Sequence, residues 1–143
     1  MIGLDEVEHF EQLLRRWIDE GWNAQNLQVI GEIFSEDYEA TGGLSNLVGD
    51  IHGHDGLSEY AQRTFDAFSD LKVAIREIHV CGNIAMLAYH FTGTHTGSLI
   101  GEKPTGNTLD MKSVDVFQYC DGKIIKRLVA HHDANLLNNQ LGL

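Results

Sequence analysis

The feature that most constrains this fold is a pair of alternating stretches joined by an Asp-Gly turn in the last third of the chain. From Thr108 to Tyr119, apolar and polar residues alternate with the period of two that a half-buried strand requires. Asp121-Gly122 then leads into a second such run, from Lys123 to about His132, and an Asp-Gly pair tolerates the positive φ angles of a tight hairpin. We therefore predict two antiparallel neighbouring strands, which hold Asp115 and Asp133 in the sheet rather than in loops.

The alternation also predicts which side chains share a face of this hairpin. One face of the first strand carries Leu109, Met111, Ser113, Asp115, Phe117 and Tyr119. On the second strand, Ile125, Arg127, Val129, His131 and Asp133 are expected on one face, and Ile124, Lys126, Leu128, Ala130 and His132 on the other. Asp115 then lies beside Met111 and Phe117, where a buried carboxylate is costly unless it is protonated or hydrogen-bonded.

Apolar residues at helical spacing predict three helices before the strands. The first is a long amphipathic helix from Leu4 to about Gly21, with acidic first turns. A second helix runs from Leu27 to near Ser35, and an extended or irregular segment follows it. A third helix follows the His52–Gly56 segment, with Asp55 as its expected amino cap, and stops at Ser69-Asp70.

Two further strands are predicted upstream of the hairpin, from Leu71 to Val80 and from Ile84 to His95. A block of helices followed by a block of antiparallel strands is typical of an α+β fold, with the helices on one face of a curved sheet. The length of 143 residues suits one domain, so we expect residues 1–143 to form a single unit.

The charge of the chain excludes several classes of partner. Ten Lys and Arg against 21 Asp and Glu give a formal net charge of -11, which repels phosphate backbones and anionic lipid surfaces. We therefore expect no nucleic acid and no membrane partner. With only two cysteines, Cys81 and Cys120, no signal peptide and no apolar run of transmembrane length, the sequence predicts a cytoplasmic protein.

Several motifs of the last third resemble, in order, those of the SnoaL-like polyketide cyclases of the NTF2-like superfamily. They are GTHTG (Gly93–Gly97), PTG (Pro104–Gly106), DGKI (Asp121–Ile124), and Asp133 followed by LL (Leu136-Leu137) and QLG (Gln140–Gly142). The resemblance implies a cone in which three amino-terminal helices pack on a curved antiparallel sheet and enclose a largely apolar pocket. It also implies an intramolecular aldol closure, in which a carboxylate removes a proton and later returns it.

Two carboxylates are the main catalytic candidates. The resemblance gives Asp133 the role of general acid/base, and the alternative is an amino cap for the segment that follows it. Asp115 matches the protonated Asp in the oxyanion hole of ketosteroid isomerases, of the same superfamily, and the alternative is a structural, hydrogen-bonded Asp. His131 and His90 are the assisting candidates. For His131, the alternative is a surface histidine at a strand end.

The candidate pocket residues come from helices and strands alike: Trp17, Thr41, Phe65, Tyr89, Met111 and Phe117. Thr41 occupies a position where many SnoaL-like proteins carry His or Asn, and this departure puts the second catalytic contact of the family in doubt. Tyr89 and His90 are adjacent on one strand, so one of them faces the pocket, and the sequence leaves open which.

A metal site is the less favoured interpretation of the histidines. His52 and His54, together with His131, His132 and Asp133, offer imidazole and carboxylate ligands. However, two His at a spacing of two share a face only on a strand, and this pair lies in a Gly-rich segment. We expect no metal and no cofactor.

The leading hypothesis is a cofactor-free enzyme acting on a small apolar carbonyl ligand by aldol-type cyclase or isomerase chemistry. The rival is a non-catalytic ligand-binding or dimerisation module of the same fold. A hydrolase of the epoxide-hydrolase type is less favoured, because the strand that carries Arg-x-Asp in that enzyme reads AYHFT here, at Ala88–Thr92. Exposed sheet faces of this architecture commonly pair, so we expect a homodimer through the convex side of the sheet.

Overall fold

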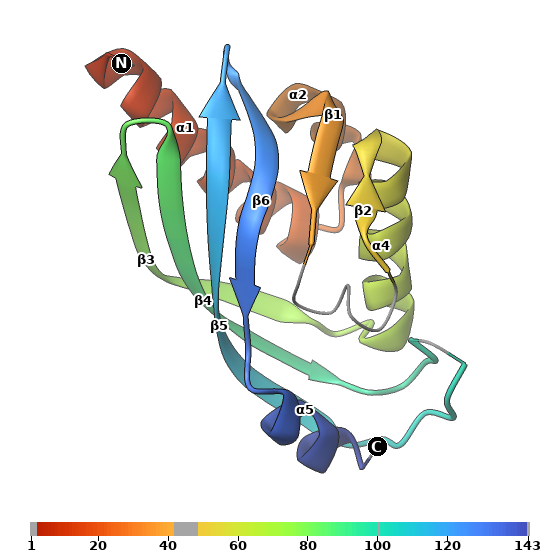
Figure 1. Cartoon of the computed structure of the whole chain (residues 1–143). Coiled ribbons are helices and arrows are strands. Elements are labelled where there is room, and N and C mark those ends of the chain that lie inside the picture. Colours follow the sequence, from red (N-terminus) through yellow and green to blue (C-terminus); the bar gives the residue numbers. More distant parts are fainter. Residues whose placement is uncertain (1–2, 42–48, 100, 143) are drawn as a thin grey trace.

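The protein is an α+β fold built on one six-stranded sheet with the strand order β2-β1-β6-β5-β4-β3 (Figure 1). This computed structural model describes residues 3–41, 49–99 and 101–142, apart from the side chains of residues 134, 135 and 137. Four long strands form most of the sheet: β3 (Lys72–Cys81), β4 (Ile84–Thr94), β5 (Thr108–Cys120) and β6 (Lys123–His131). They match the four predicted strands to within one residue at each end.

The predicted hairpin is confirmed. β5 and β6 pair in antiparallel fashion, and the turn between them is made by Asp121 and Gly122, with φ angles of 49° and 81°. These positive angles are the reason that an Asp-Gly pair occupies the turn, since both residues tolerate the left-handed region better than most.

The sheet is mixed rather than purely antiparallel, which corrects the prediction. β1 (Phe34–Ala40) runs parallel to β6, and the two-residue β2 (Ile51–His52) pairs with β1 in antiparallel fashion. The segment after the second helix was expected to be extended or irregular, and it is extended, because it forms β1. Its pairing with a strand far along the chain leaves no local signal in the sequence.

The amino-terminal helices are less regular than predicted, and the count of three is not confirmed. α1 (Leu4–Arg16) continues directly into a π-helical segment, η1 (Trp17–Asn23). The second helix is divided into a 3₁₀ turn, η2 (Leu27–Val29), and the one-turn α2 (Ile30–Ile33). α4 (Gly53–Ala67) is a regular helix, and α5 (Ala134–Leu141) follows the last strand.

The expected amino cap of α4 is wrong by three positions. His52 occupies the cap position, and Asp55 lies within the first turn of the helix. A carboxylate in the first turn still interacts favourably with the helix dipole, which explains why the sequence signal was present but misplaced.

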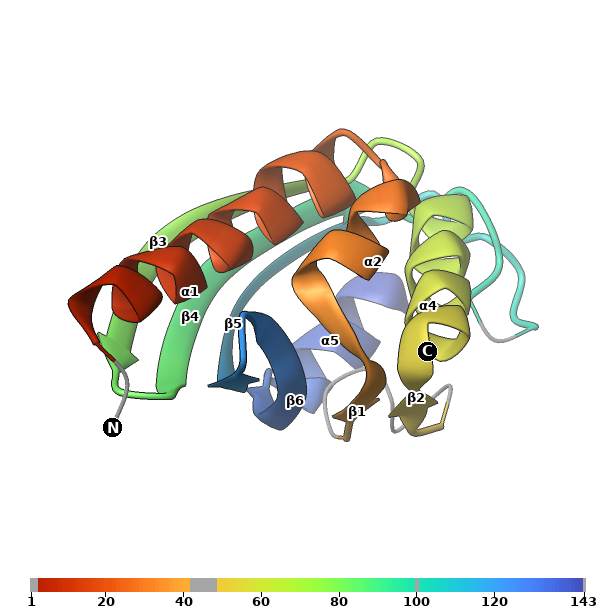
Figure 2. The ribbon, with the colours of Figure 1, turned by 90° about the horizontal axis from the view of Figure 1, so that it is seen from above.

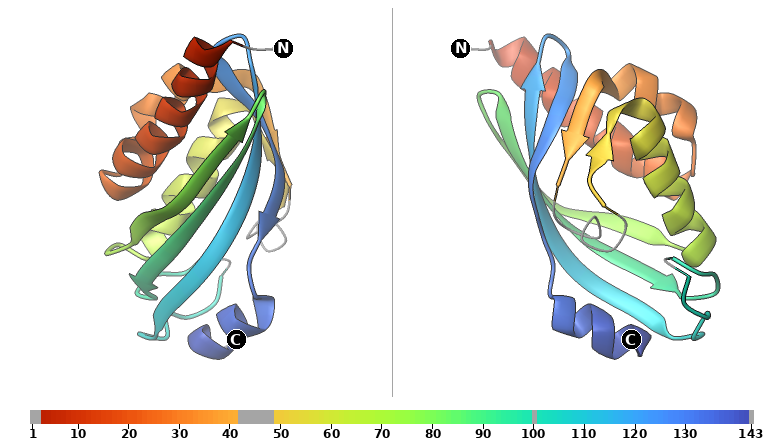
Figure 3. Two further views of the ribbon diagram at one scale, coloured as in Figure 1. Left: turned by 90° about the vertical axis from the view of Figure 1, so that its left-hand side faces the viewer. Right: turned by 45° about the vertical axis from the view of Figure 1, so that its right-hand side comes forward.

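The helices α1 and α4 cover the concave face of the curved sheet, as the side views show (Figures 2 and 3). α1 lies across β3 and β4, whereas α4 stands beside β1 and β2. One continuous hydrophobic core fills most of the space between these layers and includes Phe10, Leu14, Ile33 and Phe68. None of the helices in the described residues is both long enough and apolar enough to cross a membrane.

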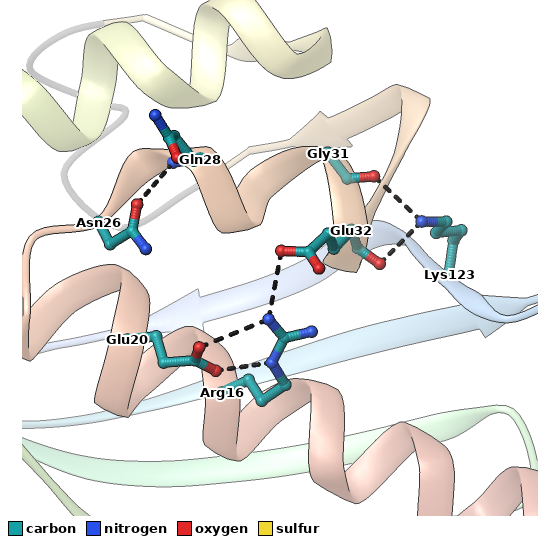
Figure 4. Close-up of polar contacts among 7 residues, drawn as sticks. All are labelled: Arg16, Glu20, Asn26, Gln28, Gly31, Glu32 and Lys123. Carbon is teal, nitrogen blue, oxygen red and sulfur yellow. Dashed lines mark hydrogen bonds and ion pairs between the residues drawn. The ribbon is translucent and has the colours of Figure 1, made fainter.

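A set of polar contacts holds the short α2 in place (Figure 4). The Arg16 guanidinium donates to Glu20 at 2.6 Å and to Glu32 at 3.3 Å, which joins the end of α1 to α2. The Lys123 ammonium donates to the carbonyl oxygens of Gly31 and Glu32 at 3.0 and 2.7 Å. Because Lys123 is the first residue of β6, these contacts bring the chain out of α2 beside β6, where β1 pairs.

Candidate functional site

A cavity lies between the helices and the concave face of the sheet. Its volume, counted as the space open to the centres of water molecules, is about 60 Å³. One water needs roughly 10 to 15 Å³ by this measure, so the space takes several waters or part of a small molecule. The predicted pocket residues that line it are Trp17, Tyr89, Met111 and Phe117. Thr41 and Phe65 are not among the lining residues, since Thr41 is exposed and Phe65 is buried behind Trp22.

The π-helical segment η1 shapes one wall of this cavity. Both tryptophans of the chain, Trp17 and Trp22, lie on it and line the cavity, with ring centroids 5.4 Å apart. In a regular α-helix, residues five apart point in different directions, whereas the wider π turn brings them to one side. Gly21 permits this packing, because a Cβ atom there would lie 2.2 Å from the Trp17 ring.

A buried polar cluster lies within this mostly apolar cavity, and Asp115 on β5 is its only carboxylate among the described lining residues. Asp115 is 6% exposed, and the Tyr89 hydroxyl donates a hydrogen bond to its Oδ1 at 3.3 Å. Burial raises the pKa of Asp115 to about 6, while Arg127 and Tyr89 oppose part of this rise. Tyr89, and not His90, therefore faces the cavity.

The prediction from sequence missed the cation of this cluster, Arg127 on β6, which is 7% exposed and lines the cavity. Burial lowers the pKa of Arg127, but the attraction of Asp115 and of nearby tyrosines outweighs this and raises it. Tyr38 on β1 and Tyr60 on α4 complete the cluster. Burial raises the pKa of both hydroxyls, and Arg127 opposes this effect, so both remain protonated and able to donate at neutral pH.

An irregularity in β6 separates residues that the alternation had placed on one face. Phe117 pairs with Arg127, whereas Val116 pairs with Val129, so Leu128 is an extra residue in a β-bulge. Each such insertion interrupts the alternation of faces along a strand. The predicted face that joined Arg127 to Val129 is therefore wrong, because Arg127 is buried and Val129 is exposed.

Asp133 lies outside the cavity-lining set and is exposed. It is the amino cap of α5, where its Oδ1 accepts a hydrogen bond from the backbone N–H of Leu136 at 3.1 Å. The capping role, one of the two interpretations left open by the sequence, is thus observed. β6 ends at His131, so Asp133 follows the sheet instead of belonging to it.

His131 and His132 line the cavity where it meets solvent. His131 is exposed and His132 is half-buried. Burial, followed by the charges of His131 and Arg127, lowers the pKa of His132, so this ring is neutral near pH 7.

His90 lies on the opposite, outer face of the sheet. Its Nε2 contacts the carboxylate of Asp110 on the neighbouring β5, and it borders a surface groove rather than the cavity. The two residues Tyr89 and His90 are thus separated by the sheet, as strand alternation requires.

The GTHTG and PTG motifs form a loop around the buried His95. The backbone N–H of Thr105 donates to His95 Nδ1 at 3.2 Å, and His95 Nε2 lies 3.1 Å from Glu102 Oε1. Because Nδ1 accepts, Nε2 carries the proton and donates to Glu102. His95 thus stabilises this loop by joining its two motifs.

Two of the histidines proposed as metal ligands contact a backbone carbonyl oxygen and a glutamate instead. His54 Nε2 is 2.8 Å from the carbonyl oxygen of Phe34, and His52 lies 3.8 Å from Glu39. Across the ranges that the structure describes, no three His, Cys, Asp or Glu side chains are grouped as they would be around a metal ion.

Solved structures with the same fold come from several bacteria. A candidate SnoaL-like polyketide cyclase from Jannaschia sp. CCS1 is 20% identical, with a TM-score of 0.81 over 94% of this chain and 92% of that one. TsrD from Streptomyces laurentii is 18% identical, with a TM-score of 0.84 over 99% and 98%. A protein with a ketosteroid isomerase-like fold from Catenulispora acidiphila, in complex with trimethylamine, is 17% identical, with a TM-score of 0.73 over 92% of each chain.

At these identities the structural likeness establishes the shared fold. No curated protein matches the chain by sequence. A family model described as SnoaL-like polyketide cyclase matches residues 12–139, which covers all six strands and most of the helical residues. On the strength of that match, this chain belongs to the SnoaL-like polyketide cyclase family.

Proposed function

We propose that this protein is a cofactor-free enzyme that acts on a small apolar carbonyl compound by acid/base chemistry of the aldol-type cyclase or isomerase class. The observation that carries the proposal is Asp115, a buried carboxyl with a pKa of about 6 in a largely apolar cavity. A general acid/base works best when its pKa lies near the working pH, because it must both accept and return a proton.

In the proposed reaction, the Asp115 carboxylate removes a proton from the carbon beside the substrate carbonyl. The electron pair of the broken C–H bond forms an enolate, whose charge is balanced by Arg127 and by hydroxyl donors of the cavity. The enolate carbon then attacks a second carbonyl or is protonated at another position. Asp115 returns its proton to the new alkoxide or carbon, so the reaction needs neither oxidant nor reductant.

The choice of Asp115 over Asp133 rests on burial. A desolvated carboxyl is a stronger base than a solvated one, and for Asp115 burial outweighs the opposing hydrogen bond from Tyr89. Asp133, in contrast, is exposed and caps a helix. A role for His131 or His90 beside Asp115 stays a prediction. Of the two, only His131 lines the same cavity.

The test is exchange of solvent deuterium into the carbon beside the carbonyl of a small apolar ketone such as cyclohexanone, followed by NMR. We expect Asp115→Asn to lower the catalysed rate by roughly 100- to 10,000-fold, the usual contribution of a general base. Asp133→Asn is the matched control, because Asn also caps helices and removes only the charge. It should leave the rate unchanged, while Asp133→Ala should cost about 1 kcal/mol of stability.

A rate loss in Asp133→Asn alone would return the catalytic role to Asp133. If the wild-type protein gives no exchange above background, the acid/base proposal is wrong. That result would favour a second function, a non-catalytic ligand-binding module. The capping role of Asp133 and the exposure of Thr41 both support this alternative, since neither of the positions carried over from the family lines the cavity.

A further inference from the structure

The cavity contains more hydrogen-bond donors than acceptors. The Arg127 guanidinium can only donate hydrogen bonds, and the hydroxyls of Tyr38, Tyr60 and Tyr89 can donate as well. Asp115 is the only carboxylate on the described cavity wall, and Tyr89 already donates to it. A ligand that complements this wall therefore brings acceptor oxygens.

Tyr38 marks where those oxygens belong. Its side chain is 1% exposed and lines the cavity, and its hydroxyl makes no hydrogen bond within the described part of the chain. Leaving a buried hydroxyl without a partner is costly, so the cavity contents must supply one. The ring of Tyr38 is held against Phe34, with centroids 4.6 Å apart, which fixes the direction of this donor.

We propose that the cavity binds its ligand through an anionic oxygen, a carboxylate or the enolate of a 1,3-dicarbonyl compound, placed against Arg127, Tyr38 and Tyr60. We further propose that Asp115 holds one proton in this complex: the proton that it removes from the substrate where the anion is an enolate, and a proton from solvent where the anion is a carboxylate that is not turned over. The inference rests on the proposed function, because it names the substrate class that the same site would accept.

The proton uptake follows from the balance of charge in the cavity. Without ligand, Arg127 and the Asp115 carboxylate balance each other, and an added anion would leave one excess negative charge away from water. Protonating Asp115 removes that excess. At pH 7 this costs only about a factor of ten in affinity, since its pKa of about 6 lies one unit lower.

Titratable groups face Asp115 from several of the elements around it. Tyr38, Tyr60 and Tyr89 face it from β1, α4 and β4, and burial raises the pKa of all three, so they do not titrate near neutrality. The η1 wall carries the uncharged Trp17, Ile18 and Trp22. The remaining groups are Arg127, which stays charged, and the histidines at positions 131 and 132.

The experiment compares benzoate with benzamide, which has nearly the same shape but no charge. Binding is followed by tryptophan fluorescence, because both tryptophans of the chain line the cavity. Benzoate is ionised throughout the range from about pH 5.5 to 8, so any change of its affinity reports on the protein. We expect benzoate to bind at least about tenfold more tightly than benzamide at pH 6, and its affinity to fall about tenfold for each pH unit above 6.

Three variants separate the contributions of Arg127, Asp115 and the two histidines to benzoate binding. Arg127→Met should remove the preference for benzoate, with circular dichroism as the check of folding. Asp115→Asn should bind benzoate with high affinity that no longer changes with pH, and this readout does not depend on the folding of the arginine variant. A His131→Gln/His132→Gln double variant should keep the pH slope of the wild type, which excludes the histidines as its source.

Equal affinity for benzoate and benzamide, or no saturable binding of benzoate at any pH tested, would overturn the proposal. A pH slope that persists in Asp115→Asn would overturn the proton uptake. These outcomes are independent of turnover. Anion binding without deuterium exchange would support the ligand class proposed here and contradict the catalytic function. Deuterium exchange without anion binding would contradict the ligand class and support the catalytic function.

Discussion

At the scale of single residues, Asp115 and Arg127 show how differently two buried charges are encoded. Asp115 lies on a strand whose alternation is unbroken, so its position among Met111 and Phe117 could be predicted from the sequence. Arg127 lies beside a bulge, and one extra residue is enough to reverse the predicted faces. The carboxylate of the site was therefore singled out from the sequence, whereas its counter-ion lies on a predicted face that the bulge divides.

The raised pKa of Asp115 makes a prediction about stability. The folded protein holds the proton more tightly than the unfolded chain, so this group stabilises the fold fully below pH 3.8 and loses that contribution as the pH rises through about 6. The shift from 3.8 to about 6 corresponds to roughly 3 kcal/mol as an upper value. Asp115→Asn should therefore gain stability relative to the wild type between pH 4 and 7, measured by urea unfolding. A constant difference across this range would contradict the burial of the charge.

At the scale of elements, the first helix was predicted but its change of winding was not. The apolar spacing from Leu4 onward fits an α-helix, and the boundary near Gly21 to Asn23 was placed correctly. A π segment is set by packing between distant side chains, here Trp17 and Trp22 against Tyr60 and Phe34. Such contacts leave no periodic signal in one sequence.

Gly21 tests whether this packing is tight. In Gly21→Ala, the new methyl group would lie 2.2 Å from Cε3 of Trp17, so the ring must move, and overpacking of this kind costs about 1 to 3 kcal/mol. Urea unfolding should show that loss, together with a changed tryptophan emission spectrum. Gly31→Ala is the matched control, because Gly31 is also helical and no atom lies within 4 Å of its Cβ position, so its effect should range from neutral to a stabilisation of about 1 kcal/mol. Equal stability of the two variants would mean that the Trp17 wall is loose.

At the scale of the whole molecule, the outer face of the sheet carries an apolar patch on its central strands. Strand register places Met86, Ala88, Val114, Val116 and Val129 on this face, opposite the cavity. Val129 is 48% exposed, although valine is usually buried. A patch of this kind on a sheet is a common site of association, which agrees with the expectation of a homodimer.

Light scattering at high protein concentration tests this expectation. The wild-type protein should be a dimer, and Val129→Lys should shift it to a monomer by placing a charge in the centre of the interface. Leu4→Lys should leave the dimer intact, because Leu4 is 83% exposed on α1, away from the patch. A monomeric wild type, or a dimer unaffected by Val129→Lys, would exclude association through this face.

The parallel pairing of β1 with β6 has a consequence for how the chain folds during synthesis. The ladder joins Phe34 with Ile124 and Ala40 with Arg127, so the edge of β1 that faces β6 stays unpaired until β6 has left the ribosome. Until then its backbone N–H and C=O groups are open to pairing with other chains, and contacts of such long range form slowly. Nascent chains that stall before Lys123 are accordingly the species from which aggregation should begin.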